Sequence, residues 1–340
     1  KEDPLFGATV LTLSNGIKVV LKHTDFKKDE IQMTATSPGG STLFGNKDID
    51  NLKVFNEVIE LGGLGNFSAT DLGKMLAGKK VSCSTSLGLD SENVNGSSTP
   101  SDLKTLFELI YLSFTAPRMD EEAYASFENR MKAQLKNLEL NPMVAFSDSL
   151  TKAIYNNNPR AMRIDPADFK NISYPRIMEM YKERFGDASG FVFTFVGNID
   201  TDSIRPLVEQ YLATLPANGK IEQGNPKEVP AIRKGDYVNR FKRQMETPKA
   251  SVVNFYSGQM DYNLENIVTA TMLKQVLDLI YTEKVREDEG GTYGVQTSAR
   301  ISSFPEGQTF LQAYFDTDPD KREKMNTIVR NELKRISDIG

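Results

Sequence analysis

The chain has 340 residues, more than one typical hydrophobic core accommodates, so two domains are expected. Its apolar fraction of 39% and charged fraction of 26% are those of an ordinary globular protein, and the sequence contains no long uncharged apolar run that would span a membrane. The net charge of -5 and pI near 5.3 argue against a nucleic-acid partner. The single cysteine, Cys83, excludes an internal disulfide and a Cys-based zinc cluster, and a Ser-His-Asp triad would have to use the single histidine, His23.

The N-terminal part of the chain predicts an alternation of strands and helices. Residues 10–26 predict a hairpin, because two alternating apolar runs meet at Asn15-Gly16. Residues 31–37 predict a strand that is closed by the turn-forming sequence Pro-Gly-Gly. Apolar residues at helical spacing then predict one helix over 49–63, ending at a glycine pair.

Short polar side chains mark several predicted helix starts, since they can accept hydrogen bonds from the first free N–H groups. Ser68, Ser101 and Ser173 are predicted caps, and either Asp200 or Thr201 caps the helix that follows a buried strand. The remaining elements are predicted as strands at 80–90, 91–99 and 189–200 and helices at 99–114, 120–138, 142–155, 174–185 and 202–216.

The order of elements repeats after a polar segment at 216–236, which is rich in proline and glycine and is predicted to be a linker. Both the 30–114 region and the 249–336 region read strand, helix, strand, strand, helix. The repeat predicts an α+β fold with a first domain at 1–215 and a second at 237–340. Since the second copy holds only the first half of the pattern and the chain starts at Lys1 without a methionine, we expect a piece of a longer protein.

The stretch "VREDEGGTYGV" places Arg286 and Tyr293 on either side of a glycine pair. Each residue also has a structural explanation: a cation is favoured at a helix C-terminus, and aromatic residues are enriched in strands. By the same reasoning Cys83 is expected to be a small buried strand residue and His23 a partly exposed strand-end residue. The glycines at 62–65 follow a predicted helix rather than a strand, so they are not a dinucleotide-binding loop.

Several stretches together resemble the pitrilysin/insulysin-type (inverzincin) zinc metallopeptidases, and most closely the C-terminal half of the large bacterial PqqL-like zinc proteases. The resemblance covers almost the whole chain in the order of that family. The stretches that carry it are "LSNGIKVVLKHTDFKKDEI", "SPGGS", "LGGLGNFSATDLGKMLAGK", "FTAPRMDEEAY", "YKERFGDASGFVFTFVGNIDTDSIRPLVEQYLATLP" and "VREDEGGTYGV".

The resemblance implies two tandem pitrilysin-like αβ domains, each an antiparallel-rich sheet with helices packed on it, the second of them truncated. It also implies a clamshell of two halves, in which the N-terminal half carries the zinc motif H-x-x-E-H. The corresponding segment here reads "NLKVFNEV" and has no histidine. The chain is therefore expected to bind no metal itself, and zinc is expected in the missing N-terminal half, which would be its partner.

The family's C-terminal half contributes an arginine and a tyrosine at the spacing of Arg286 and Tyr293. The resemblance implies that both are catalytic and that, with Gly290 and Gly291, they bind the backbone of a peptide substrate. A guanidinium or phenol donor would stabilise the oxyanion that forms when zinc-bound water attacks a peptide carbonyl. The fragment alone is expected to be inactive, and the full protein to be periplasmic or otherwise exported.

Two other functions stay open on the sequence. The chain could belong to a catalytically silent structural or partner subunit of a pitrilysin-like assembly, or it could be a separate subunit that supplies Arg286 and Tyr293 to a zinc-bearing chain. The presence of both residues favours the enzyme, because a purely structural half has no need of the pair. Natural substrate and oligomeric state are not predicted.

Overall fold

The structure is a computed structural model that describes residues 2–287 and 294–339. Its internal contacts divide the chain into two units. Unit 1 comprises Lys1–Leu138 and Arg163–Val229, and unit 2 comprises Glu139–Met162 and Pro230–Gly340. The segment 139–162, which the sequence pattern assigns to the first domain, is thus grouped with unit 2. The predicted domain boundaries themselves stay predictions.

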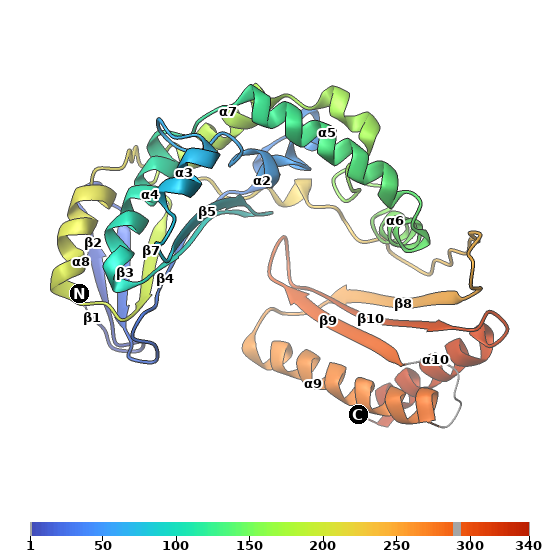
Figure 1. Cartoon of the computed structure of the whole chain (residues 1–340). Helices are drawn as coiled ribbons and strands as arrows, with labels where there is room; N and C mark the ends of the chain where they lie inside the picture. Colours follow the sequence, from blue (N-terminus) through green and yellow to red (C-terminus); the bar gives the residue numbers. More distant parts are fainter. Residues whose placement is uncertain (1, 288–293, 340) are drawn as a thin grey trace. The chain divides into compact units, whose positions relative to one another are not determined.

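Unit 1 is built on a seven-stranded sheet with the order β1-β2-β3-β7-β4-β6-β5 (Figure 1). Neighbouring strands run antiparallel except β3 and β7, which are parallel. Strand β7, the last strand of unit 1 in the sequence, lies in the middle of the sheet. The strands are β1 (Glu2–Asp3), β2 (Ala8–Thr12), β3 (Lys18–His23), β4 (Ile31–Pro38), β5 (Val81–Leu87), β6 (Ser91–Ser98) and β7 (Val192–Gly197).

The helices of unit 1 pack on one face of this sheet. Successive side chains of a strand point to opposite faces, so the side chains of β4 are alternately buried and exposed. Phe107 of α4 stacks on Phe195 of β7 with 5.0 Å between ring centroids, and both are fully buried. The helices are α1 (Ile49–Leu52), α2 (Phe55–Val58), α3 (Ala69–Met75), α4 (Leu103–Thr115), α5 (Glu121–Leu138), α7 (Tyr174–Phe185) and α8 (Thr201–Leu207), with shorter turns at η1 (Ser41–Leu43), η2 (Asn46–Asp48), η3 (Pro100–Asp102), η4 (Pro166–Asn171), η5 (Val208–Leu212) and η6 (Pro226–Glu228).

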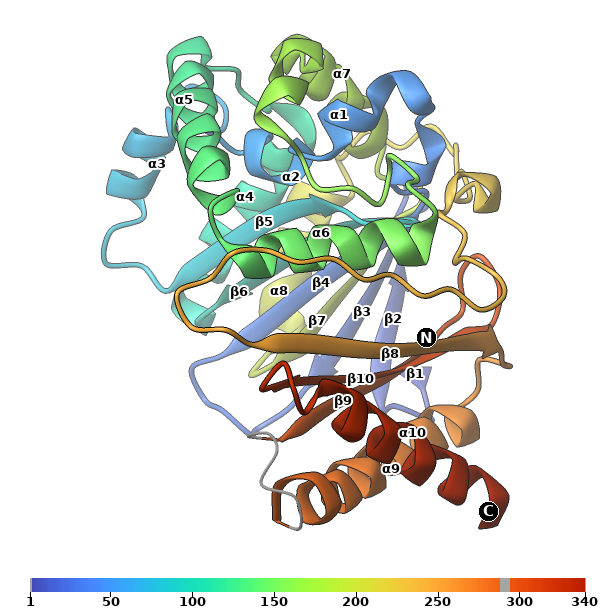
Figure 2. The ribbon, with the colours of Figure 1, turned by 90° about the vertical axis from the view of Figure 1, so that its right-hand side faces the viewer.

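Unit 2 has a three-stranded antiparallel sheet with the order β8-β10-β9. Helices α9 and α10 lie on one face of it (Figures 1 and 2). The described core of this unit consists of Leu277, Tyr281, Val295, Ala313, Phe315, Met325 and Val329. Its elements are α6 (Pro142–Tyr155), β8 (Ala250–Gln259), α9 (Leu264–Tyr281), η7 (Thr282–Glu287), β9 (Val295–Ser302), β10 (Gln308–Thr317) and α10 (Arg322–Ile339).

Most local predictions are confirmed. The hairpin turns at Asn15-Gly16, where Gly16 has φ 87°, a conformation that glycine adopts without strain. Ser68 and Ser173 cap α3 and α7 by accepting from the N–H groups of Asp71 and Arg176. Of the two candidate caps for α8, Asp200 accepts the bond, and it comes from the N–H of Asp202.

Two local predictions are wrong. The single helix predicted over 49–63 is broken into α1 and α2, because the buried Val54 leaves helical geometry with φ -122°. The helix predicted to start at Ser101 instead begins with η3, and Thr99 is its cap. Thr99 accepts from the N–H of Asp102 at 3.2 Å, and Pro100 occupies the first helical position, where its missing N–H costs nothing.

Candidate functional site

The predicted Arg/Tyr pair belongs to the segment that joins α9 to β9. Helix α9 passes at Thr282 into η7, a π-helical turn whose backbone contains Arg286. The side chain of Arg286 and the residues Gly290, Gly291 and Tyr293 lie outside the described part of the chain. The geometry of the pair therefore stays a prediction, and the described residues establish how the two ends of the segment are held.

Both ends of the segment are fastened to each other through Asp278 and Thr297. Asp278 lies in the last full turn of α9, and Thr297 is the third residue of β9. The carboxylate of Asp278 accepts from the Thr297 backbone N–H at 3.3 Å and from its hydroxyl, and also forms an ion pair with Lys274 at 2.6 Å. These bonds fix the distance the connection must span.

Tyr281 is the last residue of α9 and anchors this end of the helix, immediately before the π-helical turn. Its ring is fully buried, and its hydroxyl donates to the carbonyl of Val329 in α10 at 3.0 Å. Burial raises the pKa of the Tyr281 phenol, so it stays protonated and keeps donating. Single-turn π-helical segments frequently occur at functional sites. The turn that carries Arg286 thus starts from a buried, hydrogen-bonded residue of the unit 2 core.

Removing the charge of Asp278 tests whether its bonds with Thr297 hold the two ends of the connection together. Burial raises the pKa of this carboxyl, but its hydrogen bonds with Lys274 and Thr297 outweigh burial and lower the pKa below its ordinary value of 3.8. The charged form therefore stabilises the fold above that ordinary value, and this contribution is lost as the pH falls through the lowered folded-state pKa. Asp278→Asn should lower the free energy of unfolding by about 1 kcal/mol at pH 7, because the partly exposed pair is screened by solvent.

Urea unfolding of the Asp278→Asn variant at pH 7 and at pH 3 measures this effect. The difference from the unmodified chain should shrink at pH 3. Asp318→Asn is the matched control, since Asp318 is 65% exposed in its pair with Lys321 and should change little at either pH. A loss of equal size at both pH values would show that the charge of Asp278 does not hold the segment.

The segment that the resemblance aligns with the zinc motif uses its polar side chains for backbone bonds. Asn51 accepts from the N–H of Ser173 at 2.8 Å, and Asn56 accepts from the N–H of Leu87 at 2.8 Å. Within residues 2–287 and 294–339, no group of three His, Cys, Asp or Glu side chains is placed to hold a metal ion. These residues do not fit a zinc site, which needs three protein ligands.

His23 and Cys83 both lie in strands of unit 1. His23 ends β3, is exposed, and its Nδ1 lies 2.8 Å from the carbonyl oxygen of Ile199. Cys83 lies on β5 and packs against the core of unit 1. Burial raises the pKa of its thiol to about 12, so it is not a thiolate nucleophile at neutral pH. His23 ends a strand as predicted, and Cys83 lies in a strand as predicted but is half-buried rather than buried.

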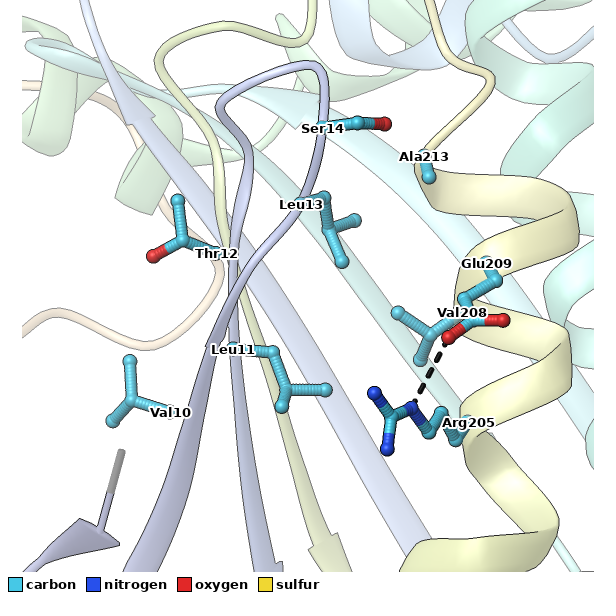
Figure 3. Close-up of a pocket in the computed structure, with 9 residues that line it drawn as sticks. All are labelled: Val10, Leu11, Thr12, Leu13, Ser14, Arg205, Val208, Glu209 and Ala213. Carbon is cyan, nitrogen blue, oxygen red and sulfur yellow. Dashed lines mark hydrogen bonds and ion pairs between the residues drawn. The ribbon is translucent and has the colours of Figure 1, made fainter.

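A pocket of about 410 Å³ lies in unit 1 between β2 and the α8–η5 region (Figure 3). Leu11, Leu13 and Val208 line it, and the guanidinium of Arg205 donates to Glu209 at 3.1 Å, which leaves no net charge there. The pocket contains none of the predicted site residues and no nucleophile with a neighbouring base. Its lining therefore offers no chemistry comparable with that of the α9–β9 connection.

The comparisons with known proteins agree with the fold. Residues 171–340 match the family described as "Peptidase M16 inactive domain". The chain is similar to the "Zinc protease PQQL-like" protein of Arabidopsis thaliana, 23% identical over 355 residues, which cover all of the chain and 34% of the relative. The chain thus spans about a third of the length of this curated relative.

Two solved structures have the same fold. The periplasmic protease PqqL from Escherichia coli superposes with a TM-score of 0.84 at 20% identity, over 97% of this chain and 36% of the other. A mutant of the ferredoxin protease FusC, in complex with Arabidopsis ferredoxin, superposes with a TM-score of 0.82 at 17% identity, with the same coverage. These likenesses confirm the predicted α+β fold of sheets covered by helices.

Proposed function

The chain belongs to the family of the M16 peptidase inactive domain, and we propose that it is the non-zinc-binding half of a zinc metalloendopeptidase. The observation that carries the proposal is that the family match covers the whole α9–β9 connection, including Arg286 and Tyr293. The relative from Arabidopsis bears the name of a zinc protease. Because this chain has a single histidine, the zinc would be held by another half of the longer protein.

In the proposed mechanism a zinc ion held by the other half would activate the attacking water, and this chain would supply hydrogen-bond donors to the substrate. Arg286 would donate to a backbone carbonyl of an extended peptide, and Tyr293 would stabilise the oxyanion that develops during attack. Gly290 and Gly291 have no side chain, so a peptide backbone could approach closely there. The proposal is supported by the anchoring of both ends of the connection through Asp278, Thr297 and Tyr281.

The rival function is that of a catalytically silent structural or partner subunit.

None of the described helices has the length and apolar character needed to cross a membrane. The similar E. coli structure is that of a periplasmic protease. We propose the same kind of compartment, periplasmic or otherwise exported, for the protein that contains this chain.

Chelation of the longer protein distinguishes the two functions. We expect the parent protein, meaning the natural polypeptide that contains this chain, to cleave an unstructured peptide, and we expect a chelator to abolish cleavage. The 340-residue chain alone should cleave nothing, because a metallopeptidase needs its metal-bound water. The measurement is fluorogenic peptide hydrolysis, with activity restored by added zinc. Absent or chelator-insensitive cleavage would favour the silent subunit.

A further inference from the structure

The three-stranded sheet of unit 2 has two faces with different surroundings. Helices α9 and α10 cover one face (Figure 2), to which the buried Val295, Ala313 and Phe315 point. Successive side chains of a strand alternate between the faces, so the residues next to these point the other way. We call that other side the open face. It carries the even-numbered residues of β9 and β10 and the odd-numbered residues of β8.

Helix α6 packs on one end of the open face. The ring of its Phe146 lies 6.1 Å from the ring of Tyr314, measured between centroids. Asp316, at the same end, forms an ion pair with Lys249 at 2.9 Å and accepts from the hydroxyl of Tyr314 at 2.8 Å. The carboxylate at this end is therefore already compensated.

The other end of the open face combines an aromatic pair with a cation. The rings of Phe255 and Phe310 stack with 5.5 Å between centroids and an interplanar angle of 20°. Arg300 of β9 lies directly opposite Phe310 of β10 in the strand register. Directly opposite residues are side-chain neighbours on one face. Both phenylalanines are half-buried, whereas Arg300 is exposed.

The charge of Arg300 is not compensated within the described part of the chain. Arg300 and Asp316 are the two charged residues among the strand positions of the open face. No described acidic side chain forms an ion pair with Arg300, in contrast to Asp316 with its lysine partner. The neighbouring positions carry the uncharged hydrogen-bonding side chains of Ser257, Ser298 and Gln312. An aromatic platform beside such a cation suits an aromatic side chain that is followed or preceded by a carboxylate.

The open face also lies in sequence next to the proposed catalytic residues. Strand β9 begins at Val295, two residues after Tyr293. From Val295 to Arg300 the strand rises by roughly 17 Å, at about 3.3 Å per residue. An extended peptide covers the same distance with about five residues. A substrate whose scissile bond is held by Tyr293 is thus long enough to reach Arg300 within a short segment.

We propose that the open face binds side chains of an extended peptide substrate, and that Arg300 selects an acidic residue beside an aromatic one. The aromatic ring packs on Phe255 and Phe310, and the carboxylate pairs with the guanidinium of Arg300, roughly five to seven residues from the bond that is cleaved. The ligand is a polypeptide rather than a nucleic acid, because the chain has a net charge of -5 and this face offers one cation. The identification of this peptide as the substrate rests on the proposed function, whereas its binding does not.

Fluorescence anisotropy of labelled peptides measures the binding without catalysis. At low salt the 340-residue chain should bind a Gly-Ser peptide with two Glu-Phe pairs about fivefold more tightly than one with two Gln-Phe pairs, the effect of one exposed ion pair. Arg300→Gln should abolish this difference. Arg330→Gln is the matched control at an exposed arginine of α10 and should preserve it. Equal affinity of the unmodified chain for both peptides would overturn the proposal, as would tighter binding of a single-stranded oligonucleotide of equal charge.

Charge reversal provides a readout that partial unfolding cannot imitate. Arg300→Glu should invert the preference, so that a peptide with Lys-Phe pairs binds about fivefold more tightly than the peptide with Glu-Phe pairs. Phe310→Leu should keep the preference for Glu over Gln but weaken the binding of phenylalanine-containing peptides relative to peptides with serine at those positions. If the Arg300→Glu chain still prefers the acidic peptide, the carboxylate binds elsewhere and the proposal is wrong.

Kinetics of the parent protein connect this face with proteolysis. Arg300→Gln should raise KM for the Glu-Phe peptide about fivefold and leave kcat unchanged, because the arginine is placed away from the reacting bond. KM for the Gln-Phe peptide should stay the same. If the parent cleaves neither peptide while the 340-residue chain still discriminates between them, the proposed function fails and the binding face stands. If the parent cleaves both and Arg300→Gln alters neither KM, the binding face fails and the proposed function stands.

Discussion

Replacing Tyr293 by phenylalanine in the parent protein is expected to lower kcat by about 100- to 1000-fold. The phenol is proposed to donate to the oxyanion in the transition state, and phenylalanine keeps the ring while it removes this donor. KM should change little, because the ground-state carbonyl carries less negative charge than the oxyanion. Steady-state kinetics on a fluorogenic peptide measures both values.

Two further readouts separate a catalytic role from a structural one. Zinc content and the thermal midpoint of the Tyr293→Phe variant should equal those of the unmodified protein. Tyr262→Phe is the matched control, since Tyr262 precedes α9 in the same unit and is 54% exposed. An unaltered turnover of the Tyr293 variant would make the residue a strand aromatic, and an equal loss in both variants would indicate a general effect of the substitution.

The elements that the sequence predicts correctly are those determined by local interactions. Ser68 and Ser173 cap helices through bonds to N–H groups three residues away, and the turn at Asn15-Gly16 depends on the conformation of one glycine. Such interactions involve residues that are close together in the sequence. Their pattern therefore predicts the element and its start.

The predictions are wrong or silent where residues distant in the sequence meet. The break between α1 and α2 falls beside Lys53, whose ammonium forms ion pairs with Asp50 at 3.0 Å and with Asp168, 115 residues away, at 3.2 Å. The insertion of β7 between β3 and β4 likewise depends on pairing across more than 150 residues. Helical periodicity contains neither piece of information.

The candidate site illustrates the same limit. The spacing of Arg286 and Tyr293 alone is equally compatible with a helix end and a strand start, and only the family resemblance gives the pair a chemical role. The sequence pattern did not reveal that Asp278 and Thr297 join the two ends of the connection. A polar residue in the last turn of a helix and a threonine in the next strand are too common to signal a contact.

Composition predicts the turn "SPGGS", and the structure shows why it contains glycines. Gly40 has φ 81°, and a side chain at Gly39 would collide with the carboxylate of Glu92. Glu92 is 1% exposed and accepts from the N–H of Gly40 at 2.8 Å. The guanidinium of Arg184 lies 3.7 Å from the Glu92 carboxylate and also forms an ion pair with Glu222. The turn is thus closed over a buried charge.

Removing Arg184 should destabilise unit 1 strongly. Arg184→Leu leaves the carboxylate of Glu92 buried without a cation, and breaking a buried pair in this way costs about 3–5 kcal/mol of the free energy of unfolding. Burial already raises the pKa of Glu92 above its ordinary value, although its bond with Gly40 and the charge of Arg184 lower it. The substitution should raise this pKa further.

The sign of the pH dependence follows from that direction. A carboxyl whose pKa is raised in the folded state holds a proton that the unfolded chain releases, so stability falls as the pH rises through the raised value. Urea unfolding should therefore show a larger loss for Arg184→Leu at pH 8 than at pH 5. Arg205→Leu, which removes an exposed partner of Glu209, should change little at either pH.

A double variant decides whether the buried charge is the cause. Glu92→Gln keeps an oxygen that can accept from the N–H of Gly40 and carries no charge, so Arg184→Leu with Glu92→Gln should recover at least half of the lost stability and lose its pH dependence. If the double variant is as unstable as Arg184→Leu alone, the loss comes from the packing of the arginine side chain and its bond to Glu222. Recovery would mean that Arg184 is required in unit 1 chiefly because Glu92 closes the glycine turn.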